Sequence, residues 1–185
     1  MPARLERICV YCGAAEGARP AYLDSARVLG AEIARRGIEL IYGGGHVGMM
    51  GTLADAALAA GGRVTGIIPQ QLIDRELGHR SITDLRIVQS MHERKSLMAR
   101  MSDAFMALPG GWGTLDELTE MLTWFQLGFH QKPIAIVNIE GYFDALLAFE
   151  AHMEQEGFLR NHGRHLFISG RDPLEVLDRL TGSTG

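Results

Sequence analysis

Short apolar runs alternate with longer amphipathic segments along nearly the whole chain. The short runs are mostly apolar throughout rather than at every second position, which is typical of strands buried on both faces of a sheet. This pattern predicts strands at residues 7–11, 39–42, 64–68, 85–89, 104–108, 133–138 and 165–168. Apolar residues at helical spacing predict helices between them, at residues 21–36, 48–60, 92–101, 115–128, 143–156 and 173–180.

The alternation of strands and helices predicts an α/β fold, namely a Rossmann-like, doubly wound parallel sheet in a three-layer α/β/α arrangement. Three expected helices are followed by a glycine, at Gly37, Gly61 and Gly157, as is common after a last turn. No linker or repeat divides the chain, so we expect residues 1–185 to form a single nucleotide-binding domain. Ligands of such sheets bind beyond the carboxyl ends of the strands. The glycine-rich turns after the second and fifth strands therefore lie on the functional edge.

Composition and charge narrow the class of protein. Hydrophobic residues make up 46% of the chain and the net charge is −4, which disfavours disorder and leaves no basic surface for nucleic acid. No apolar run is long enough to cross a membrane, and the N-terminus lacks a signal-peptide pattern, so we expect a cytoplasmic protein. Cys9 and Cys12 form a C-x-x-C without a second pair, and we interpret them as a strand residue and a loop residue. His162 and His165 lie in a polar stretch and are interpreted as surface residues.

The first glycine turn reads YGGGHVGMMG and contains a G-x-G-x-x-G pattern. Gly43, Gly44 and Gly45 are therefore candidates for ligand contacts. A dinucleotide fingerprint would follow the first strand and would place an acid at the end of the next strand, whereas Pro69 and Gln70 stand there. NAD binding is thus disfavoured. The alternative is that the glycines allow close packing of strand, turn and helix.

The second glycine turn reads LPGGWGTLDE. Gly110, Gly111 and Gly113 let the backbone approach an anion, with Thr114 expected as the N-cap of the helix that follows. No lysine with serine or threonine follows the glycines, so a single phosphate monoester fits better than ATP with magnesium. Thr114 and Glu117 have the spacing of a capping box. The alternative interpretation is that Glu117 faces the same pocket as the anion.

A third segment, SMHERKSLMARM, places an arginine on an apolar stripe. At helical spacing, Arg94 shares that stripe with Met91, Leu97, Met98 and Met101. A charge there requires an anionic partner, either Glu117, a substrate phosphate or both, unless the side chain reaches the surface. Lys95, at the edge of the stripe, is expected to be solvated.

Taken together, PGGWGTLDE, SMHERK, YGGGHVGMMG and the leading CVYCGAA resemble the LOG family of cytokinin riboside 5′-monophosphate phosphoribohydrolases. The resemblance covers nearly the whole chain in order and spacing. It implies hydrolysis of the N-glycosidic bond of a purine nucleoside 5′-monophosphate, of cytokinin type or AMP, without metal or cofactor. It departs from the family at Ala14 and Ala15, where serines are frequent, so no hydroxyl contact is available there.

The resemblance also implies roles for individual residues. Arg94 and Glu117 would be the catalytic pair, with Glu117 acting as a base or as a nucleophile. The implied substrate contacts are Glu76, Lys95, Gly111, Trp112, Gly113, Thr114, Leu115, Asp116 and Thr123. The family is commonly dimeric, so a homodimer is expected. The aromatic residues Trp124, Phe125 and Phe129 near the end of the active-site helix offer apolar surface for such contacts, and the alternative is ordinary core packing.

Two alternatives belong to other functional classes. A non-catalytic nucleotide-binding module of the same fold would bind but not cleave, and a dinucleotide-dependent oxidoreductase lacks its ribose-binding acid. The family is often labelled lysine decarboxylase, but pyridoxal phosphate chemistry requires a Schiff-base lysine. The only lysines are Lys95, which has another implied role, and Lys132, which precedes a strand far from the functional edge.

Overall fold

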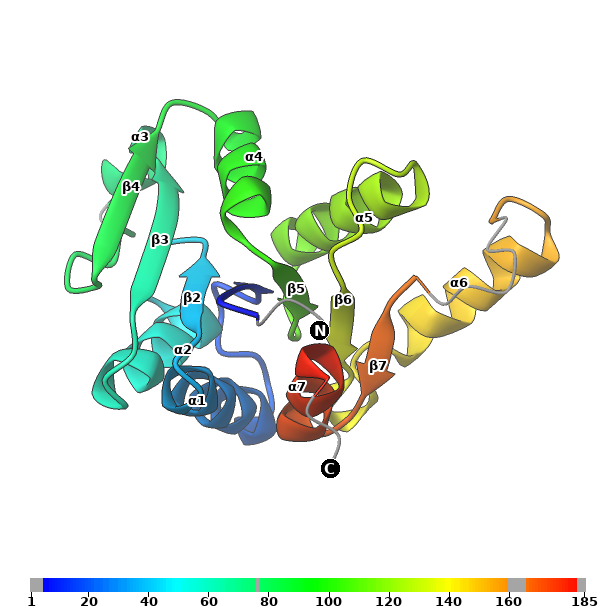
Figure 1. The fold of residues 1–185 in the computed structure, drawn as a ribbon, viewed down its shortest axis with the longest axis horizontal. Helices are drawn as coiled ribbons and strands as arrows, with labels where there is room; N and C mark the ends of the chain where they lie inside the picture. The colour runs from blue at the N-terminus through cyan, green and yellow to red at the C-terminus, as the bar shows by residue number, and fades with distance from the viewer. Residues whose placement is uncertain (1–4, 76, 160–165, 183–185) are drawn as a thin grey trace.

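The strands of this protein form one parallel sheet, as shown by a computed structural model that describes residues 5–75, 77–159 and 166–182 (Figure 1). The strand order is β4-β3-β2-β1-β5-β6-β7, and every neighbouring pair is parallel. The strands are β1 (Arg7–Tyr11), β2 (Glu39–Tyr42), β3 (Val64–Pro69), β4 (Asp84–Val88), β5 (Ala104–Ala107), β6 (Ile134–Val137) and β7 (Ile168–Gly170). The α/β, doubly wound prediction is confirmed.

Side chains of the central strands alternate between two buried layers. In β1, Ile8 and Val10 pack into one hydrophobic cluster, and Cys9 and Tyr11 pack into the other. Residues of β5 and β6 divide between the same two clusters. Because both faces are covered, neither set can be polar, which explains the uninterrupted apolar runs in the sequence.

Helices cover both faces of the sheet, as Figure 1 shows. They are α1 (Pro20–Arg35), α2 (Gly48–Ala59), α3 (Gln70–Ile73), α4 (Met91–Met101), α5 (Trp112–Gln126), α6 (Asp144–Gln155) and α7 (Pro173–Thr181), with a 3-10 turn, η1 (Ile139–Gly141). Residues of α1, α2 and α7 belong to one cluster, and residues of α4 and α5 to the other. No helix among the described residues is long and apolar enough to cross a membrane.

The predicted helices are all present, with differences at some ends. The helix expected from residue 115 begins three residues earlier, at Trp112. The last strand occupies Ile168–Gly170 rather than residues 165–168, of which residue 165 lies outside the described residues, as does His162. The short elements α3 and η1 were not predicted, because one helical turn carries too little periodicity to be recognised.

The bulky residues at the end of α5 are only partly available at the surface. Trp124 and Phe125 are partly buried and pack against the hydrophobic cluster beneath α5, as the alternative of ordinary core packing predicts. Phe129 is 74% exposed, and Leu127 beside it is 63% exposed. Burial of the first two follows from the helical phase, which points them toward the sheet.

The strand order reverses between β1 and β5. The chain leaves β1 toward β2 on one side, and β5 begins the series on the other side. At such a switch point the loops beyond the strand ends separate and leave space for a ligand. The turns after β1, β2 and β5 all meet at this edge, as the sequence predicted for the two glycine turns.

Candidate active site

A cavity of about 310 Å³ lies at the switch point. Its lining comes from the turns after β1 and β2, from α4, and from the amino end of α5. Arg94 and Glu117 both reach it, together with Gly43, Gly45, Gly111, Gly113 and Thr114. The fold therefore brings the catalytic pair expected from the sequence to one cavity with both glycine turns.

Helix α5 opens on a glycine rather than on the expected Thr114. The N-cap is Gly111, with extended backbone angles (φ −93°, ψ −153°) and no side-chain cap. Thr114 is inside the first turn and buried, with its side chain packed under Gly110, where an added Cβ would overlap Oγ1 of Thr114. The capping-box interpretation of Glu117 is therefore wrong. Its carboxylate is free of that role and faces the cavity.

Two glycines of this turn are not explained by packing within the chain. A Cβ added at Gly111 or Gly113 would meet no atom within 4 Å, and neither residue has a positive φ. At most glycines with close neighbours in this fold, such as Gly43 and Gly110, an added Cβ would by contrast clash. The absence of side chains at 111 and 113 leaves the amino end of α5 open, with first-turn N–H groups that have no acceptor within the helix.

Helix α2 also starts near the cavity, but N–H groups of its first turn already donate hydrogen bonds within the chain. At the amino end of α2, the N–H groups of Met49 and Met50 donate to the carbonyls of Ala15 (3.3 Å) and Gly13 (3.2 Å). These carbonyls belong to the loop after β1 and neutralise the first turn of α2. An anion in the cavity is therefore directed to α5 rather than to α2.

Arg94 is held at the carboxyl ends of β2 and β3. Its Nε donates to the carbonyl of Ile67 and its Nη2 to the carbonyl of Gly43, both at 3.0 Å. Its Nη1 lies 3.6 Å from Oε1 of Glu117. The residue is only 8% exposed, so the alternative in which it reaches the surface is wrong. The two carbonyls fix the guanidinium plane and aim its remaining edge at Glu117.

Glu117 is a buried carboxyl with a perturbed pKa. It is 8% exposed, and burial raises its pKa from 4.5 to about 6, although the charge of Arg94 acts in the opposite direction. The pKa rises overall because desolvation is larger than the lowering by Arg94. A carboxyl that titrates near neutral pH in a cavity is a common feature of catalytic sites.

Lys95 is paired with acids, so the expectation that it is solvated is wrong. Its Nζ donates to Oδ2 of Asp116 at 3.0 Å and lies 3.4 Å from Oε2 of Glu120, and its side chain is 12% exposed. Burial opposes ionisation, but these two acids raise the pKa of Lys95 overall. Lys95 therefore joins α4 to α5 on the turns that flank Glu117, and its charge also lowers the pKa of Glu117.

The first glycine turn is shaped mainly by packing. A Cβ at Gly43 would overlap Nη2 of Arg94, Gly44 has φ +75°, and a Cβ at Gly45 would press against the Met50 side chain. These requirements account for Gly43 and Gly44 without a ligand, whereas the flexible end of Met50 can move away from a Cβ at Gly45. Since Gly43 and Gly45 also line the cavity, contacts from this turn to a ligand stay a prediction.

The other residues implied by resemblance fall into different positions. Trp112 is 87% exposed, Leu115 packs against the cluster under α5, and the Thr123 hydroxyl donates to the carbonyl of Thr119 in its own helix (2.7 Å). None of these three lines the cavity, and neither does Asp116. Glu76 lies outside the described residues. Their substrate contacts stay predictions.

Sequence reasoning missed the apolar wall of the cavity. It consists of Met50 on α2, Ile68 at the end of β3, and Leu72 and Leu77 on the connection from β3 to β4. The position of Leu72 and Leu77 just beyond a strand end was the available signal, because ligands of such sheets bind there. An apolar wall suits the face of a nucleobase.

Both cysteines are free and buried. Cys12 lines the cavity, and desolvation strongly raises the pKa of its thiol, which keeps it protonated and unreactive. Lys132, the second lysine, precedes β6 and donates to the carbonyl of Ala99 (2.7 Å). It lies at the amino ends of the strands, away from the cavity, as the sequence predicted.

Known proteins are similar to this chain over most of its length. A family model described as "Possible lysine decarboxylase" matches residues 50–180. The cytokinin riboside 5′-monophosphate phosphoribohydrolase LOG of Oryza sativa subsp. japonica is 46% identical over 96% of this chain and 73% of its own length. LOG1 of Arabidopsis thaliana, with the same enzyme name, is 44% identical over 96% of this chain and 83% of its own length.

Among solved structures, a molybdenum cofactor binding protein from Rippkaea orientalis aligns with a TM-score of 0.74 at 24% identity, covering 98% of both chains. DNA processing protein A from Helicobacter pylori aligns with a TM-score of 0.58 at 10% identity, covering 98% of this chain and 83% of that one. At these identities the likeness establishes the fold alone.

Proposed function

Because this chain belongs to the LOG family of cytokinin riboside 5′-monophosphate phosphoribohydrolases, we propose that it hydrolyses the N-glycosidic bond of a purine nucleoside 5′-monophosphate. The base is adenine or an N6-modified adenine of the cytokinin type. Water adds to C1′ of the ribose, the C1′–N bond breaks with its electron pair moving to the base, and a proton from water ends on the base. The products are the free base and ribose 5-phosphate.

The observation that carries this proposal is the open amino end of α5 beside a buried carboxylate. The first-turn N–H groups, reached across Gly111 and Gly113, are suited to the dianionic 5′-phosphate. Glu117 lies one turn further along the same helix and lines the same cavity. A phosphate held at the helix end therefore places the ribose near the carboxylate.

The chemistry of the bond assigns roles to Glu117 and Arg94. Cleavage builds positive charge on the ribose, which a nearby carboxylate stabilises. The same carboxylate is placed to activate water or to attack C1′, and both routes use the same contacts of Glu117 and Arg94. Arg94, fixed by two carbonyls, keeps Glu117 in place and favours its ionised form. We propose that neither a metal nor a cofactor is required.

Two observations weigh against the other candidates. A non-catalytic binding module has no use for a carboxylate beside a bound phosphate, because the two repel each other. Lysine decarboxylation needs a lysine that can form a Schiff base in the cavity, whereas Lys95 is paired with acids and Lys132 lies at the opposite edge of the sheet. We further propose that the protein works in the cytoplasm and binds neither nucleic acid nor membranes, in keeping with its free thiols and net charge of −4.

Incubation with AMP and, separately, adenosine tests the proposed function. We expect chromatography to show adenine released from AMP without added cofactor, and kcat/KM for adenosine to be at least about a hundredfold lower, because binding of the remote phosphate positions the sugar. Unchanged AMP that nevertheless binds in calorimetry would support the binding module instead. Equal cleavage of adenosine would contradict the phosphate site at α5. The ratio of kcat/KM for isopentenyladenosine monophosphate and AMP then identifies the preferred base.

The pKa of Glu117 in the ligand-free protein predicts a pH dependence of kcat/KM. Since the ionised carboxylate is the active form, kcat/KM should fall as pH decreases and reach half its plateau near pH 6 rather than near 4.5. A phosphate monoester also titrates near pH 6, so assigning the midpoint to Glu117 requires a direct measurement of its titration. In protein with 13C-labelled glutamate carboxyls, the resonance missing from Glu117→Gln should titrate with a midpoint about 6. A midpoint near 4.5 would contradict the rise in the pKa of Glu117 through burial.

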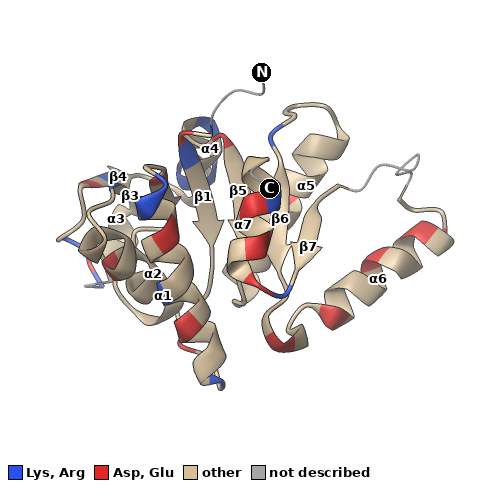
Figure 2. Cartoon of the chain, turned by 60° about the horizontal axis from the view of Figure 1, so that its bottom comes forward, with Lys and Arg blue, Asp and Glu red and all other residues tan. Residues whose placement is uncertain are grey.

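We also propose that the protein is a homodimer that associates through α6 and the carboxyl end of α5. No residue of α6 is fully buried, and Figure 1 shows it apart from the other helices. Phe129, Phe149 and Phe158 are 74%, 56% and 82% exposed. Figure 2 shows that α6 carries acids but no lysine or arginine, so its contacts with a second copy would be largely apolar. Exposed apolar surface of this kind is typical of interfaces.

Light scattering at micromolar concentration should give a mass of twice 20.3 kDa. Replacing both Phe129 and Phe149 by Glu should shift the mass to that of one chain, because the charges would have to be buried in the interface. Val28→Glu, at an exposed position of α1, is the matched control and should leave the mass unchanged. A single-chain mass for the natural sequence would contradict the homodimer.

A further inference from the structure

The apolar wall of the cavity depends on a segment that has little structure of its own. Leu72 and Leu77 lie on the connection between β3 and β4, which contains only the single-turn helix α3. Figure 1 shows α3 and α5 on opposite sides of α4. With the phosphate at α5, the nucleobase extends toward this connection, so the position of the connection determines how the base is held.

Backbone contacts tie this connection to the first glycine turn. Gly45 and Gly78 form an antiparallel bridge, and the N–H of His46 donates to the carbonyl of Leu77 at 3.1 Å. The N–H of His79 donates to the carbonyl of Gly44 at 2.8 Å. These contacts fix the end of the connection relative to the turn. Side chains add a further contact between the connection and α2, which carries Met50 of the same wall.

One side-chain pair spans from the connection to α2. Nε2 of His79 lies 2.9 Å from Oδ1 of Asp55. His79 is only 7% exposed, whereas the side chain of Asp55 is 68% exposed. The imidazole is therefore buried between the connection and α2, with a carboxylate that remains in solvent. Burying a polar ring costs free energy that an apolar residue would not, so stability alone is a poor reason for a histidine here.

We propose that the His79–Asp55 pair is a positioning device that sets the nucleobase wall of the cavity, acting through Leu72 and Leu77. This inference rests on the proposed function, because it assumes that the ligand is a nucleoside monophosphate with its phosphate at α5. Neither residue lines the cavity, so neither is a catalytic residue. Losing the pair loosens the wall but leaves Arg94, Glu117 and the amino end of α5 in place.

The proposal predicts that loss of the pair weakens binding of AMP, which carries a base, but not of ribose 5-phosphate, which has none. Asp55→Ala should raise KM for AMP about three- to tenfold, the range for losing one typical intramolecular hydrogen bond, with kcat within about twofold of the natural protein. Measured by calorimetry in the Glu117→Gln background, which slows turnover but keeps AMP binding, the dissociation constant of AMP should rise by the same factor. That of ribose 5-phosphate should not change, because it lacks the base. Asp55 is exposed, so its truncation leaves no cavity in the core.

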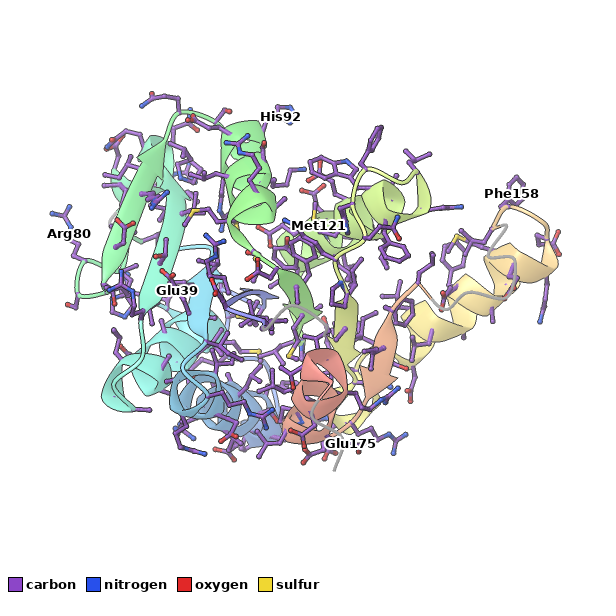
Figure 3. The ribbon with its side chains drawn as sticks, in the orientation of Figure 1. Glu39, Arg80, His92, Met121, Phe158 and Glu175 are labelled. Carbon is purple, nitrogen blue, oxygen red and sulfur yellow. The ribbon has the colours of Figure 1, made fainter. Side chains whose placement is uncertain are left out.

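Substitutions at His79 complete the experiment. His79→Ala should weaken AMP binding at least as much as Asp55→Ala, because it also leaves a small cavity, and the double variant should be no worse than His79→Ala, since both substitutions remove the same contact. His79→Gln, whose amide can donate to Asp55 from a similar position, should restore most of the AMP affinity. Arg80→Ala is the control, since Arg80 points away from the molecule in Figure 3 and should behave like the natural protein.

The outcomes separate this inference from the proposed function. Natural protein that binds AMP without cleaving it would overturn the hydrolase proposal alone, and the affinities for AMP and ribose 5-phosphate would still decide the role of His79. Unchanged AMP affinity in both Asp55→Ala and His79→Ala would overturn the positioning role. An equal loss of affinity for AMP and ribose 5-phosphate would also overturn it, because a general loosening of the fold would then explain the data.

Discussion

Glu117→Gln is expected to lower kcat for AMP hydrolysis by roughly a hundredfold or more while the protein stays folded. The amide keeps the length of the side chain and an oxygen acceptor, but it removes the charge that stabilises the cationic ribose. Because Thr114 lies inside α5 and the helix is capped at Gly111, no capping contact is lost. AMP should bind as tightly as before or more tightly, since a charge that repels the phosphate has gone.

A matched substitution separates this effect from a general loss of stability. Glu175→Gln makes the same chemical change on α7, on the other face of the sheet (Figure 3), and should leave kcat unchanged. Circular dichroism and the thermal midpoint should show that both variants are folded. A folded Glu117→Gln protein with kcat close to that of the natural protein would reject the proposed mechanism and return the residue to a structural role.

Arg94→Ala is expected to lower kcat by a similar factor, roughly a hundredfold or more. Two effects combine, since Glu117 loses the cation that holds it in place and its pKa rises further above 6 without Arg94. The pH at which the remaining activity is half its maximum should therefore move upward. Arg100→Ala, at an exposed position of the same helix, should leave kcat and this midpoint unchanged.

Combining the two substitutions tests whether the pair acts as a unit. Because each single change disables the same arrangement, the double variant should be only about threefold worse than either single variant. Removal of Arg94 also leaves the carbonyls of Gly43 and Ile67 without their donor. Arg94→Lys, which keeps the charge but cannot bridge both carbonyls, provides a second measurement if Arg94→Ala is unstable. Turnover by a folded Arg94→Ala protein within about threefold of the natural rate would contradict the pairing.

The sequence by itself determined the sheet, its parallel strands and the edge at which the site lies. Strands buried on both faces require continuous apolar runs, and the runs at β1, β5 and β6 are of this kind. It also predicted that Arg94 needs an anionic partner, because a charge on the apolar stripe of a helix cannot stay unpaired. Both inferences depend only on periodicity and on local chemistry, which a sequence displays directly.

The tertiary structure alone decided the contacts that define the site. Thr114 had the right spacing for an N-cap, but the close packing of Gly110 over its side chain places it inside the helix. Lys95 is buried by acids about twenty residues away, and Glu117 titrates near 6 because of burial that no short segment reveals. The apolar wall and the His79–Asp55 pair likewise join residues of different elements. Each depends on distances between elements, which are fixed only when the helices pack on the sheet.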